Sequence, residues 1–599
     1  MMRQHGIRRR VEWAAVLLTM TASLAGFGHS QSTIPDADRK GSHQADKQPP
    51  QASQPDVSQT GGAAASTTAK SSDAGAIAPI PRGLLGQAMD LARKGDYDEA
   101  IKKYEELLQE KPKSPDAYAG LARAYLKKKD VTQAYEIANK GVEATDSWAV
   151  HVALAEVYFR QGRIPEAEKE WVGILKAGHP SARAYLGLAR VRWAIEMNKT
   201  AKTFIDQAHE LDPEDPEIQS FWIGTLPRAE RIQYYEKYLA DPSNSNPEER
   251  ADLQKYLSYL KDQQKLNQRP CRLVSKVTHT ETPLVRLLVD PTHMRGYGLA
   301  VDLNGTRSNF MLDTGAHGIT VKRNIAERAG MSKIVETKIW GIGDRGLKDA
   351  YVGTVKSIRI GELEFQDCPV EVMESRSVAG EDGLIGADVF EDFLVDIDFP
   401  DEKLKLSELP KRPGQAEQPL GLRNNDEESA DEDRSSKEVT AAKDASVTSS
   451  SGPQDRYIAP EMQSFTRVFR FGHDLLVPTK VGDVPNKLFL LDTGSLTNFI
   501  SPQAAREVTK VHNDADTTVK GISGSVRNVY SANKAVLQFG NLRQENQDMT
   551  SFNMDAISES DGTEISGFFG FVMLRFIDIK IDYRDALIDF TFDPKRYRF

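Results

Sequence analysis

Between residues 83 and 268, apolar side chains recur at a helical spacing, and the pattern repeats along the chain. Turns of related sequence begin at Gly95, Lys129, Gly162 and Glu196, so successive turns lie 34, 33 and 34 residues apart. Small residues cluster between the turns, where paired helices must approach closely. A period of this length is typical of helix-turn-helix units that stack side by side. We therefore predict an α-solenoid over residues 83–268.

The second half of the chain changes to short apolar runs bounded by glycine, a pattern that indicates β-strands. Two such runs, 310–312 and 489–491, end in the same Asp-Thr-Gly turn, at Asp313 and at Asp492. A Gly-rich segment and then an apolar segment ending in glycine follow each turn in the same order. From residue 383 to residue 399 the second copy follows at a constant offset of 184 residues. This colinearity indicates an internal duplication.

Each copy resembles the bacterial branch of the retropepsin-type aspartic proteases, in which an Asp-Thr-Gly turn, a flap hairpin and an apolar segment ending in glycine occur in this order. The resemblance covers roughly residues 287–406 and 468–592. Members of this family build one active site from two such halves. Because both halves lie in one chain, the resemblance implies two mainly-β lobes that form an intramolecular pseudo-dimer. The helical repeats resemble tetratricopeptide (TPR) repeats.

These patterns divide the chain into six segments. We expect a signal peptide at 1–30, a disordered linker at 31–82, a TPR-like helical repeat domain at 83–268, a retropepsin-like lobe at 269–408, a disordered acidic linker at 409–463 and a second lobe at 464–599. Both linkers are poor in large apolar residues and cannot bury enough surface to offset the entropy of ordering. The second linker is long enough for the second lobe to fold back onto the first.

The resemblance implies that Asp313 and Asp492 form a catalytic dyad. Two carboxyl groups held a few ångströms apart do not both ionise cheaply, so such a pair retains a proton. One carboxylate then takes a proton from a bound water, while the protonated partner hydrogen-bonds the substrate carbonyl. The expected reaction is hydrolysis of a polypeptide, without a cofactor or a metal. The two roles are not assigned to individual residues, because a coupled pair titrates as a unit.

Other residues are expected to support this dyad. In the family, Thr314 and Thr493 cross-link the two active-site turns, while Gly315 and Gly494 leave room for water and substrate where a Cβ would obstruct. Flaps are expected to close over the substrate. The predicted flap residues are Gly341, Ile342 and Gly343 in the first copy and Gly521, Ile522 and Ser523 in the second.

The N-terminus predicts export. Three arginines, Arg8 to Arg10, precede an apolar run from Trp13 to about Ala25, which is the layout of a secretory signal peptide. The run is short for a stable membrane span, and an uncleaved membrane tether is the alternative. We therefore expect a periplasmic or secreted protein. In an oxidising compartment Cys271 and Cys368 would form a disulfide or remain as two free buried thiols.

The formal net charge of -10, with no basic stretch interleaved with aromatic residues, argues against a nucleic-acid partner. The TPR surface would recruit a polypeptide substrate or a protein partner, or act as a spacer. The alternative to a protease is a catalytically silent scaffold whose lobes bind peptides. A further alternative keeps catalysis but pairs each lobe with the same lobe of another chain.

Overall fold

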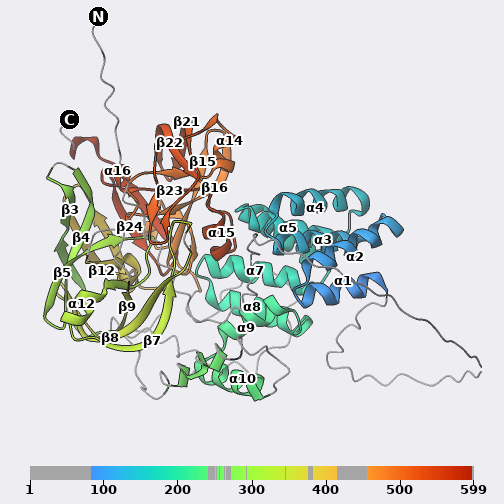
Figure 1. Ribbon diagram of the computed structural model, residues 1–599, viewed down its shortest axis with the longest axis horizontal. Coiled ribbons are helices and arrows are strands. Elements are labelled where there is room, and N and C mark those ends of the chain that lie inside the picture. The colour runs from blue at the N-terminus through green and yellow to red at the C-terminus, as the bar shows by residue number, and fades with distance from the viewer. Residues whose placement is uncertain are drawn as a thin grey trace, which may run out of the picture.

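The computed structural model describes residues 83–596, with gaps at 241–249, 292, 345, 375–381 and 414–454 and at scattered positions between 251 and 270. The predicted signal peptide (1–30), the first linker (31–82) and most of the second linker therefore lie outside the described residues. The described part is a helical solenoid followed by two mainly-β lobes (Figure 1). This is the predicted fold class.

The solenoid consists of antiparallel helices that pack in pairs. They are α1 (Leu84–Arg93), α2 (Tyr97–Glu110), α3 (Pro115–Lys127), α4 (Val131–Thr145), α5 (Trp148–Arg160), α6 (Ile164–Lys176), α7 (Ala182–Ala194), α8 (Asn198–Leu211), α9 (Pro216–Thr225) and α10 (Arg228–Ala240). Glycines allow the close approach of helices: a Cβ on Gly187 would lie 2.4 Å from the Trp171 ring, and one on Gly120 would lie 2.3 Å from the Tyr104 ring. The small residues noted in the sequence thus mark the contacts between helices.

Ion pairs connect distant helices of the solenoid. Arg93, at the end of α1, lies 3.3 Å from Glu214, which follows α8. Arg183 of α7 lies 2.6 Å from Asp215 and 3.3 Å from Glu217. Helices from the first and last repeats are therefore joined, and α1 lies beside α8 in Figure 1.

Lobe 1 contributes strands β1 to β12. They are β1 (Arg272–Leu273), β2 (His279–Pro283), β3 (Val285–Asp290), β4 (His293–Leu303), β5 (Thr306–Asp313), β6 (Ile319–Lys322), β7 (Ser332–Ile339), β8 (Lys348–Ile360), β9 (Leu363–Met373), β10 (Gly383–Gly386), β11 (Phe393–Asp398) and β12 (Lys403–Glu408), with the short helix α12 (Arg323–Arg328). Most of them form one nine-stranded sheet in the order β1-β9-β6-β10-β5-β4-β8-β7, with β3 paired to β4.

Lobe 2 repeats this plan with strands β13 to β25. They are β13 (Thr466–Arg467), β14 (Phe469–Phe471), β15 (Asp474–Val481), β16 (Val484–Leu491), β17 (Phe499–Ile500), β18 (Val511–Asn513), β19 (Lys520–Gly521), β20 (Gly524–Ser525), β21 (Val529–Phe539), β22 (Leu542–Phe552), β23 (Gly567–Phe569), β24 (Asp578–Asp582) and β25 (Leu587–Thr591). Three short helices, α14 (Pro502–Arg506), α15 (Asp555–Asp561) and α16 (Phe571–Leu574), connect them. The main sheet has eight strands in the order β14-β15-β16-β23-β17-β22-β21-β18.

A third sheet joins the two lobes. Its order is β13-β25-β24-β11-β12-β2, so each lobe supplies three neighbouring strands. The junction is the antiparallel pair β11 and β24, in which Val395 lies opposite Ile581 and Ile397 opposite Ile579. These four apolar side chains are fully buried. The lobes of a single chain therefore associate through continuous backbone pairing.

The solenoid packs directly on lobe 2. Phe159 and Trp171 of the solenoid belong to the same buried apolar cluster as Leu476 of β15 and Leu488 of β16. The rings of Phe159 and Phe471 meet edge to face with their centres 6.3 Å apart. Figure 1 shows α5 and α7 beside α15 and the β16 edge of lobe 2. The repeat domain thus shares a core with the β domain.

The predicted disordered linker, 409–463, differs from the structure at its C-terminal end. Residues 455–463 are described, and Ala459 and Met462 are buried against Leu587 of lobe 2. Asp455 accepts hydrogen bonds from the backbone N–H groups of Lys199 and Thr200, at 3.0 and 2.8 Å, and so caps α8. Because the segment as a whole is polar, its composition did not indicate that Ala459 and Met462 are buried or that Asp455 caps a helix.

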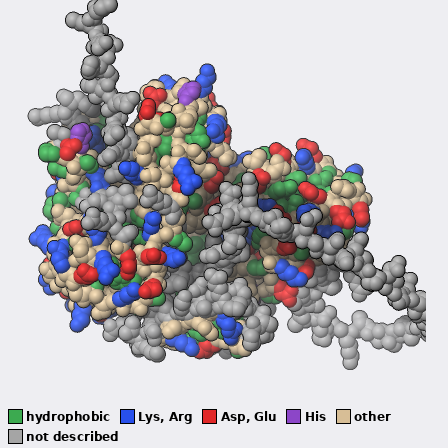
Figure 2. Space-filling view, viewed as in Figure 1, with side chains coloured by type: hydrophobic (Ala, Val, Ile, Leu, Met, Phe, Trp, Pro, Cys, Tyr) green, Lys and Arg blue, Asp and Glu red, His purple; other side chains and the backbone are tan. Residues whose placement is uncertain are grey.

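Within the described residues, no helix has the length and apolar character that a bilayer span requires. On the face shown in Figure 2, basic and acidic side chains are interspersed over both β lobes.

Candidate active site

A buried strand delivers each Asp-Thr-Gly turn to the interface between the lobes. In lobe 1, β5 runs parallel to β10, and Asp313 lies opposite Gly386. In lobe 2, β16 runs parallel to β23, with Leu491 opposite Phe569. All four residues at the end of β5 are buried, as are those at the end of β16. The apolar segments that end in glycine therefore support the two turns from behind.

The two turns bring Asp313 and Asp492 together, and both side chains have no exposed surface. Their carboxyl groups are in hydrogen-bond contact. A Cβ on Gly494 would lie 2.3 Å from Oδ2 of Asp313, and one on Gly315 would lie 3.0 Å from Cγ of Asp492. Each carboxyl group thus rests on the glycine of the opposite turn, and any larger residue there would displace it.

Threonine hydroxyl groups lock the turns to each other. The Thr314 backbone N–H donates to Oγ1 of Thr493 at 3.0 Å, and the Thr493 N–H donates to Oγ1 of Thr314 at 3.1 Å. Each hydroxyl then donates across the interface, Thr314 to the Leu491 carbonyl at 2.7 Å and Thr493 to the Leu312 carbonyl at 2.9 Å. This reciprocal set fixes the separation of the two carboxyl groups.

Burial controls the charge of the pair. Burial raises the pKa of Asp313 to about 7, against hydrogen bonds from the Gly315 and Gly494 backbone that favour the charged form. Burial, and then the charge of Asp313, hold the pKa of Asp492 well above its usual range. One oxygen of each carboxyl group, Oδ2, receives no hydrogen bond from a donor in the described structure. A proton shared between the two carboxyl groups satisfies both.

The predicted flap residues meet each other across the two lobes. The lobe 1 flap is the turn between β7 and β8, and the lobe 2 flap is the β19–β20 hairpin. The Ser523 N–H donates to the Ile342 carbonyl at 3.1 Å, and the Gly341 N–H donates to Oγ of Ser523 at 3.2 Å. A Cβ on Gly343, whose φ is 130°, would lie 2.5 Å from the Ser523 backbone, and one on Gly521 would lie 2.3 Å from the Ile342 carbonyl oxygen.

The tip of each flap is buried in an apolar cluster of the other lobe. Ile522 of lobe 2 packs with Ala316, which follows the lobe 1 turn, and with Ile339 and Leu384. Ile342 of lobe 1 belongs to the cluster that lobe 2 shares with the solenoid. The flaps are therefore crossed and closed above a dyad that water does not reach in this conformation.

Cys271 and Cys368 are joined by a disulfide bond. The bridge ties the chain entering lobe 1 to β9, and the Cys271 N–H also donates to the Asp367 carbonyl at 3.0 Å. Of the two states that the sequence left open, the structure has the bonded one.

The sequence analysis missed a second set of buried titratable residues beside the dyad. Asp474, at the start of β15, is completely buried and in hydrogen-bond contact with Asp561 of α15. His473 is buried against the Gly315 backbone, and burial lowers its pKa to about 4. None belongs to a motif. The available signal was the run Asp474-Leu475-Leu476-Val477, because adjacent apolar residues indicate a strand covered on both faces.

His317, four residues after Asp313, pairs with the buried Asp388 through Nδ1 at 2.5 Å. Burial alone would lower the pKa of His317, but the hydrogen bond and the charge of Asp388 raise it. Asp388 also accepts from the Gly318 N–H at 2.9 Å. This pair braces the loop after the active-site turn.

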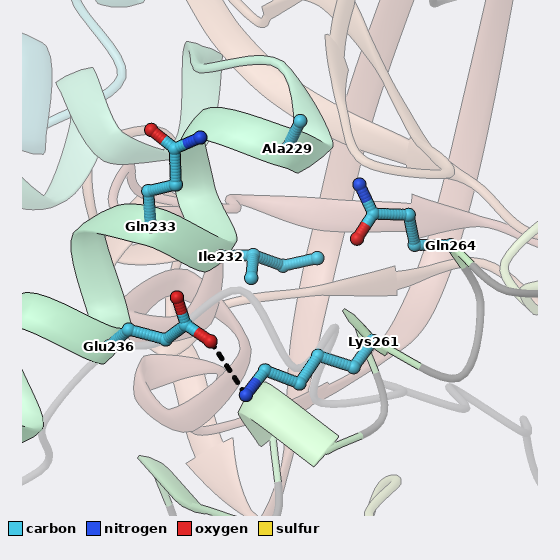
Figure 3. A pocket seen from close by; sticks show the side chains of 6 residues that line it. All are labelled: Ala229, Ile232, Gln233, Glu236, Lys261 and Gln264. Atoms are coloured by element: carbon cyan, nitrogen blue, oxygen red, sulfur yellow. Dashed lines mark ion pairs between the residues drawn. The ribbon is translucent and has the colours of Figure 1, made fainter.

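A surface hollow of about 430 Å³ lies far from this chemistry, between α10 and the helical residues near 261. Figure 3 shows its lining, which consists of Ala229, Ile232, Gln233, Glu236, Lys261 and Gln264. The charged pair in it, Glu236 and Lys261, is joined at 2.7 Å. None of the predicted site residues lines this hollow. The described residues also hold no group of three or more potential metal-binding side chains.

Comparison with known proteins agrees with this architecture. Residues 299–389 match an aspartyl protease family, and residues 91–147 and 152–216 match two tetratricopeptide repeat families. Among curated proteins, DNA damage-inducible protein 1 of Chaetomium globosum is 33% identical over 109 residues, and the UBA domain-containing protein Mud1 of Schizosaccharomyces pombe is 27% identical over 123 residues. These matches cover 18% of this chain and 23% and 36% of the relatives, so the chain spans about a third or less of their length.

Solved structures resemble single parts of the chain. A thermophilic TPR protein of Thermus thermophilus shares 24% identity, covering 30% of this chain and 97% of its own, with a TM-score of 0.25. A retropepsin-like aspartic protease from Rickettsia conorii shares 20% identity, covering 23% of this chain and 96% of its own, with a TM-score of 0.17. The family matches therefore identify an aspartyl protease segment and two tetratricopeptide segments on one polypeptide.

Proposed function

We propose that this chain is an exported aspartic endopeptidase whose catalytic dyad is Asp313 and Asp492. One observation carries the proposal: the two carboxyl groups are in hydrogen-bond contact, each against the glycine of the opposite turn. A strand-end aspartate with a merely structural role has no need of a second buried acid beside it. A shared proton on a buried pair is the state from which two aspartic acids can activate a water for peptide hydrolysis.

In the proposed reaction, a water lies between the dyad and the scissile peptide bond. The ionised carboxyl group removes a proton from this water as its oxygen attacks the carbonyl carbon, and the protonated partner donates a hydrogen bond to the carbonyl oxygen. The tetrahedral intermediate then collapses as the C–N bond breaks and the leaving nitrogen takes up a proton from the dyad. No covalent enzyme intermediate forms. Thr314 and Thr493 hold the geometry and do not transfer protons.

Substrate access requires the flaps to separate, because both carboxyl groups are fully buried when the flaps are crossed. An extended peptide would replace the contact between Ile342 and Ser523. Gly341 would then donate to the peptide the backbone N–H that it donates to Ser523 in the closed state. Closure over the peptide excludes water other than the reacting one.

Export is the second part of the proposal. The predicted signal peptide and the disulfide between Cys271 and Cys368 both favour an oxidising compartment, periplasmic or secreted. The solenoid surface that lobe 2 leaves uncovered would recruit the substrate or a protein partner, as TPR-type solenoids usually do.

The deciding experiment is the cleavage of a denatured general protein substrate by the full chain across acidic to neutral pH. We expect D313N and D492N each to abolish cleavage, and a statine-type transition-state mimic to inhibit the wild type. D483N is the matched control, because Asp483 is fully exposed at the β15–β16 turn and should not affect the rate. A correctly folded wild type that binds peptides and cleaves none would instead establish the silent scaffold.

A further inference from the structure

The strongest unexplained feature is the contact between the α5–α6 corner of the solenoid and α15 of lobe 2. Arg160, the last residue of α5, donates from Nη1 to the Ser558 carbonyl. The Thr563 hydroxyl donates to the Phe159 carbonyl at 2.7 Å, and Lys129, in the neighbouring turn between α3 and α4, pairs with Glu559 at 2.5 Å. A Cβ on Gly162 would lie only 3.1 Å from the Glu564 carbonyl oxygen. The backbone of the solenoid at Gly162 is therefore in close contact with the backbone of lobe 2 at Glu564.

The segment held by this corner leads straight to the proposed dyad. After α15, the Ile565 N–H donates to Oγ of Ser558 at 2.9 Å, and the Ser566 N–H donates to the Leu488 carbonyl of β16 at 2.8 Å. Strand β23 follows at once, and its Phe569 carbonyl accepts the N–H of Asp492 at 3.0 Å. The backbone of Asp492 is thus only a few hydrogen bonds away from the solenoid.

A second connection runs through side chains. Asp561 ends α15 and contacts the carboxyl group of Asp474, on the strand next to β16. No donor among the described residues reaches either oxygen of Asp474, although Nε2 of His473 is 3.4 Å from Oδ1. A proton held between the two acids therefore supplies the missing hydrogen bond. Burial favours that proton, since it raises the pKa of Asp561 to about 8 even with the positive charge of Arg160 nearby.

We propose, on the basis of the proposed function, that the repeat domain completes the active site. Arg160 and the Asp474–Asp561 carboxyl pair are positioning residues. They fix α15 and β23, and these elements in turn fix the placement of Asp492. Arg160 is surrounded by acids of lobe 2, namely Asp555, Glu559, Asp561 and Glu564. Its partly buried guanidinium, together with Lys129, supplies the counter-charge with which this acidic segment packs on the solenoid. The solenoid thus acts as a third lobe of the enzyme, in addition to any role in recruitment.

The test uses the full chain with R160Q, R160K and the matched control R163Q. Arg163 lies in the same corner, and its side chain interacts within the solenoid, with Glu166 at 3.2 Å, with Tyr135 and with the Tyr158 ring. We expect R160Q to lower kcat by about tenfold or more with little change in KM, because a small displacement of a reacting group is costly. R160K should recover part of kcat, and R163Q should match the wild type.

The carboxyl pair is tested with D561N and D561L. The side-chain amide introduced by D561N can donate to Asp474 as a protonated acid does, so this variant should keep kcat. D561L leaves Asp474 without a donor and should lower kcat. Hydrogen exchange at the peptides containing Asp492 and Phe569 is the readout that does not need activity. Hydrogen exchange at these peptides should be faster than in the wild type for R160Q and D561L, and unchanged for R163Q and D561N.

The results separate the two proposals. If the wild type cleaves nothing, the proposed function fails, but the exchange rates still decide whether Arg160 positions the Asp492 strand. The inference is overturned if R160Q and D561L match R163Q in exchange at these peptides, or if kcat is unchanged in an active enzyme. If R160Q does not fold, R160K takes its place. The comparison of D561N with D561L then also decides whether the carboxyl pair positions Asp492.

Discussion

Asp396 of β11 lies directly opposite Lys580 of β24 at the centre of the sheet that joins the lobes. The two positions correspond to each other in the duplication, since they are separated by the constant offset of 184 residues. The pseudo-twofold axis therefore passes between them. Two copies of lobe 1 would place two acids on this axis, and two copies of lobe 2 would place two lysines there. Only the mixed pairing places an acid opposite a base at these two positions, where the Asp396 side chain also contacts the carboxyl group of Asp578.

The first prediction concerns this axis. K580D places a third acid beside Asp396 and Asp578 and should destabilise the chain by up to about 1 kcal/mol, whereas the double exchange D396K/K580D should recover most of the loss, with D396K alone completing the cycle. Urea unfolding of the four proteins measures the coupling. Equal and additive losses, with no recovery in the double variant, would show that these charges do not favour the mixed pair.

The pH dependence of cleavage follows from the dyad. Burial raises the pKa of Asp313 to about 7, and burial together with the charge of Asp313 holds the pKa of Asp492 well above its usual range. The pair therefore loses its first proton near pH 7 and keeps the second, shared proton to a higher pH. We expect kcat/KM to rise as the pH approaches about 7, where one carboxyl group becomes the base, and to fall only when the shared proton is lost at a higher pH. A rate that instead falls as the pH rises toward 7 would point to a different catalytic group.

The threonine lock should be measurable as stability. T314A and T493A each remove a hydroxyl group that donates to one buried carbonyl and accepts from one buried N–H. Each should cost about 1–3 kcal/mol of unfolding free energy, because buried partners are left unsatisfied. T314S and T493S keep the hydroxyl and serve as controls. Guanidinium unfolding curves compare the four variants, and equal stability of the Ala and Ser forms would contradict the lock.

The glycines of the turns give a steric prediction. G494A places a Cβ 2.3 Å from Oδ2 of Asp313, so it should abolish cleavage and lower stability. G173A is the control, because a Cβ on Gly173 in α6 meets nothing within 4 Å and should be neutral or stabilising by up to about 1 kcal/mol. Activity and melting temperature distinguish the two changes. A G494A enzyme with normal turnover would rule out the contact.

The disulfide prediction concerns reduction. Cys271 and Cys368 are separated by 97 residues, and opening a loop of this size costs up to about 4.7 kcal/mol in chain-entropy models. The C271S/C368S variant should unfold at a lower denaturant concentration than the wild type. Dithiothreitol should lower the wild-type midpoint to the same value and leave the variant unchanged. A wild-type midpoint that ignores the reductant would mean that the thiols are free in solution.

The sequence predicted the parts of the molecule that repeat. The period of the helical turns predicted the solenoid, and the two copies of Asp-Thr-Gly predicted which carboxyl groups would meet. The contacts between unlike parts carry no such signal. Arg160 and Ser558 lie 398 residues apart in unrelated segments, and neither belongs to a motif. Only the adjacent apolar residues of β15 indicated that something covers the outer face of lobe 2.

The crossed flaps have a kinetic consequence. Because Ile342 is buried with lobe 2 and Ile522 is buried with lobe 1, neither hairpin can lift without withdrawing the other from its apolar cluster. Opening is therefore a single concerted event, and its barrier includes the exposure of both isoleucines at once. Such a gate spends most of its time shut, which would protect neighbouring proteins from indiscriminate cleavage and would lower the apparent affinity for substrate by the fraction of the time that the gate is open.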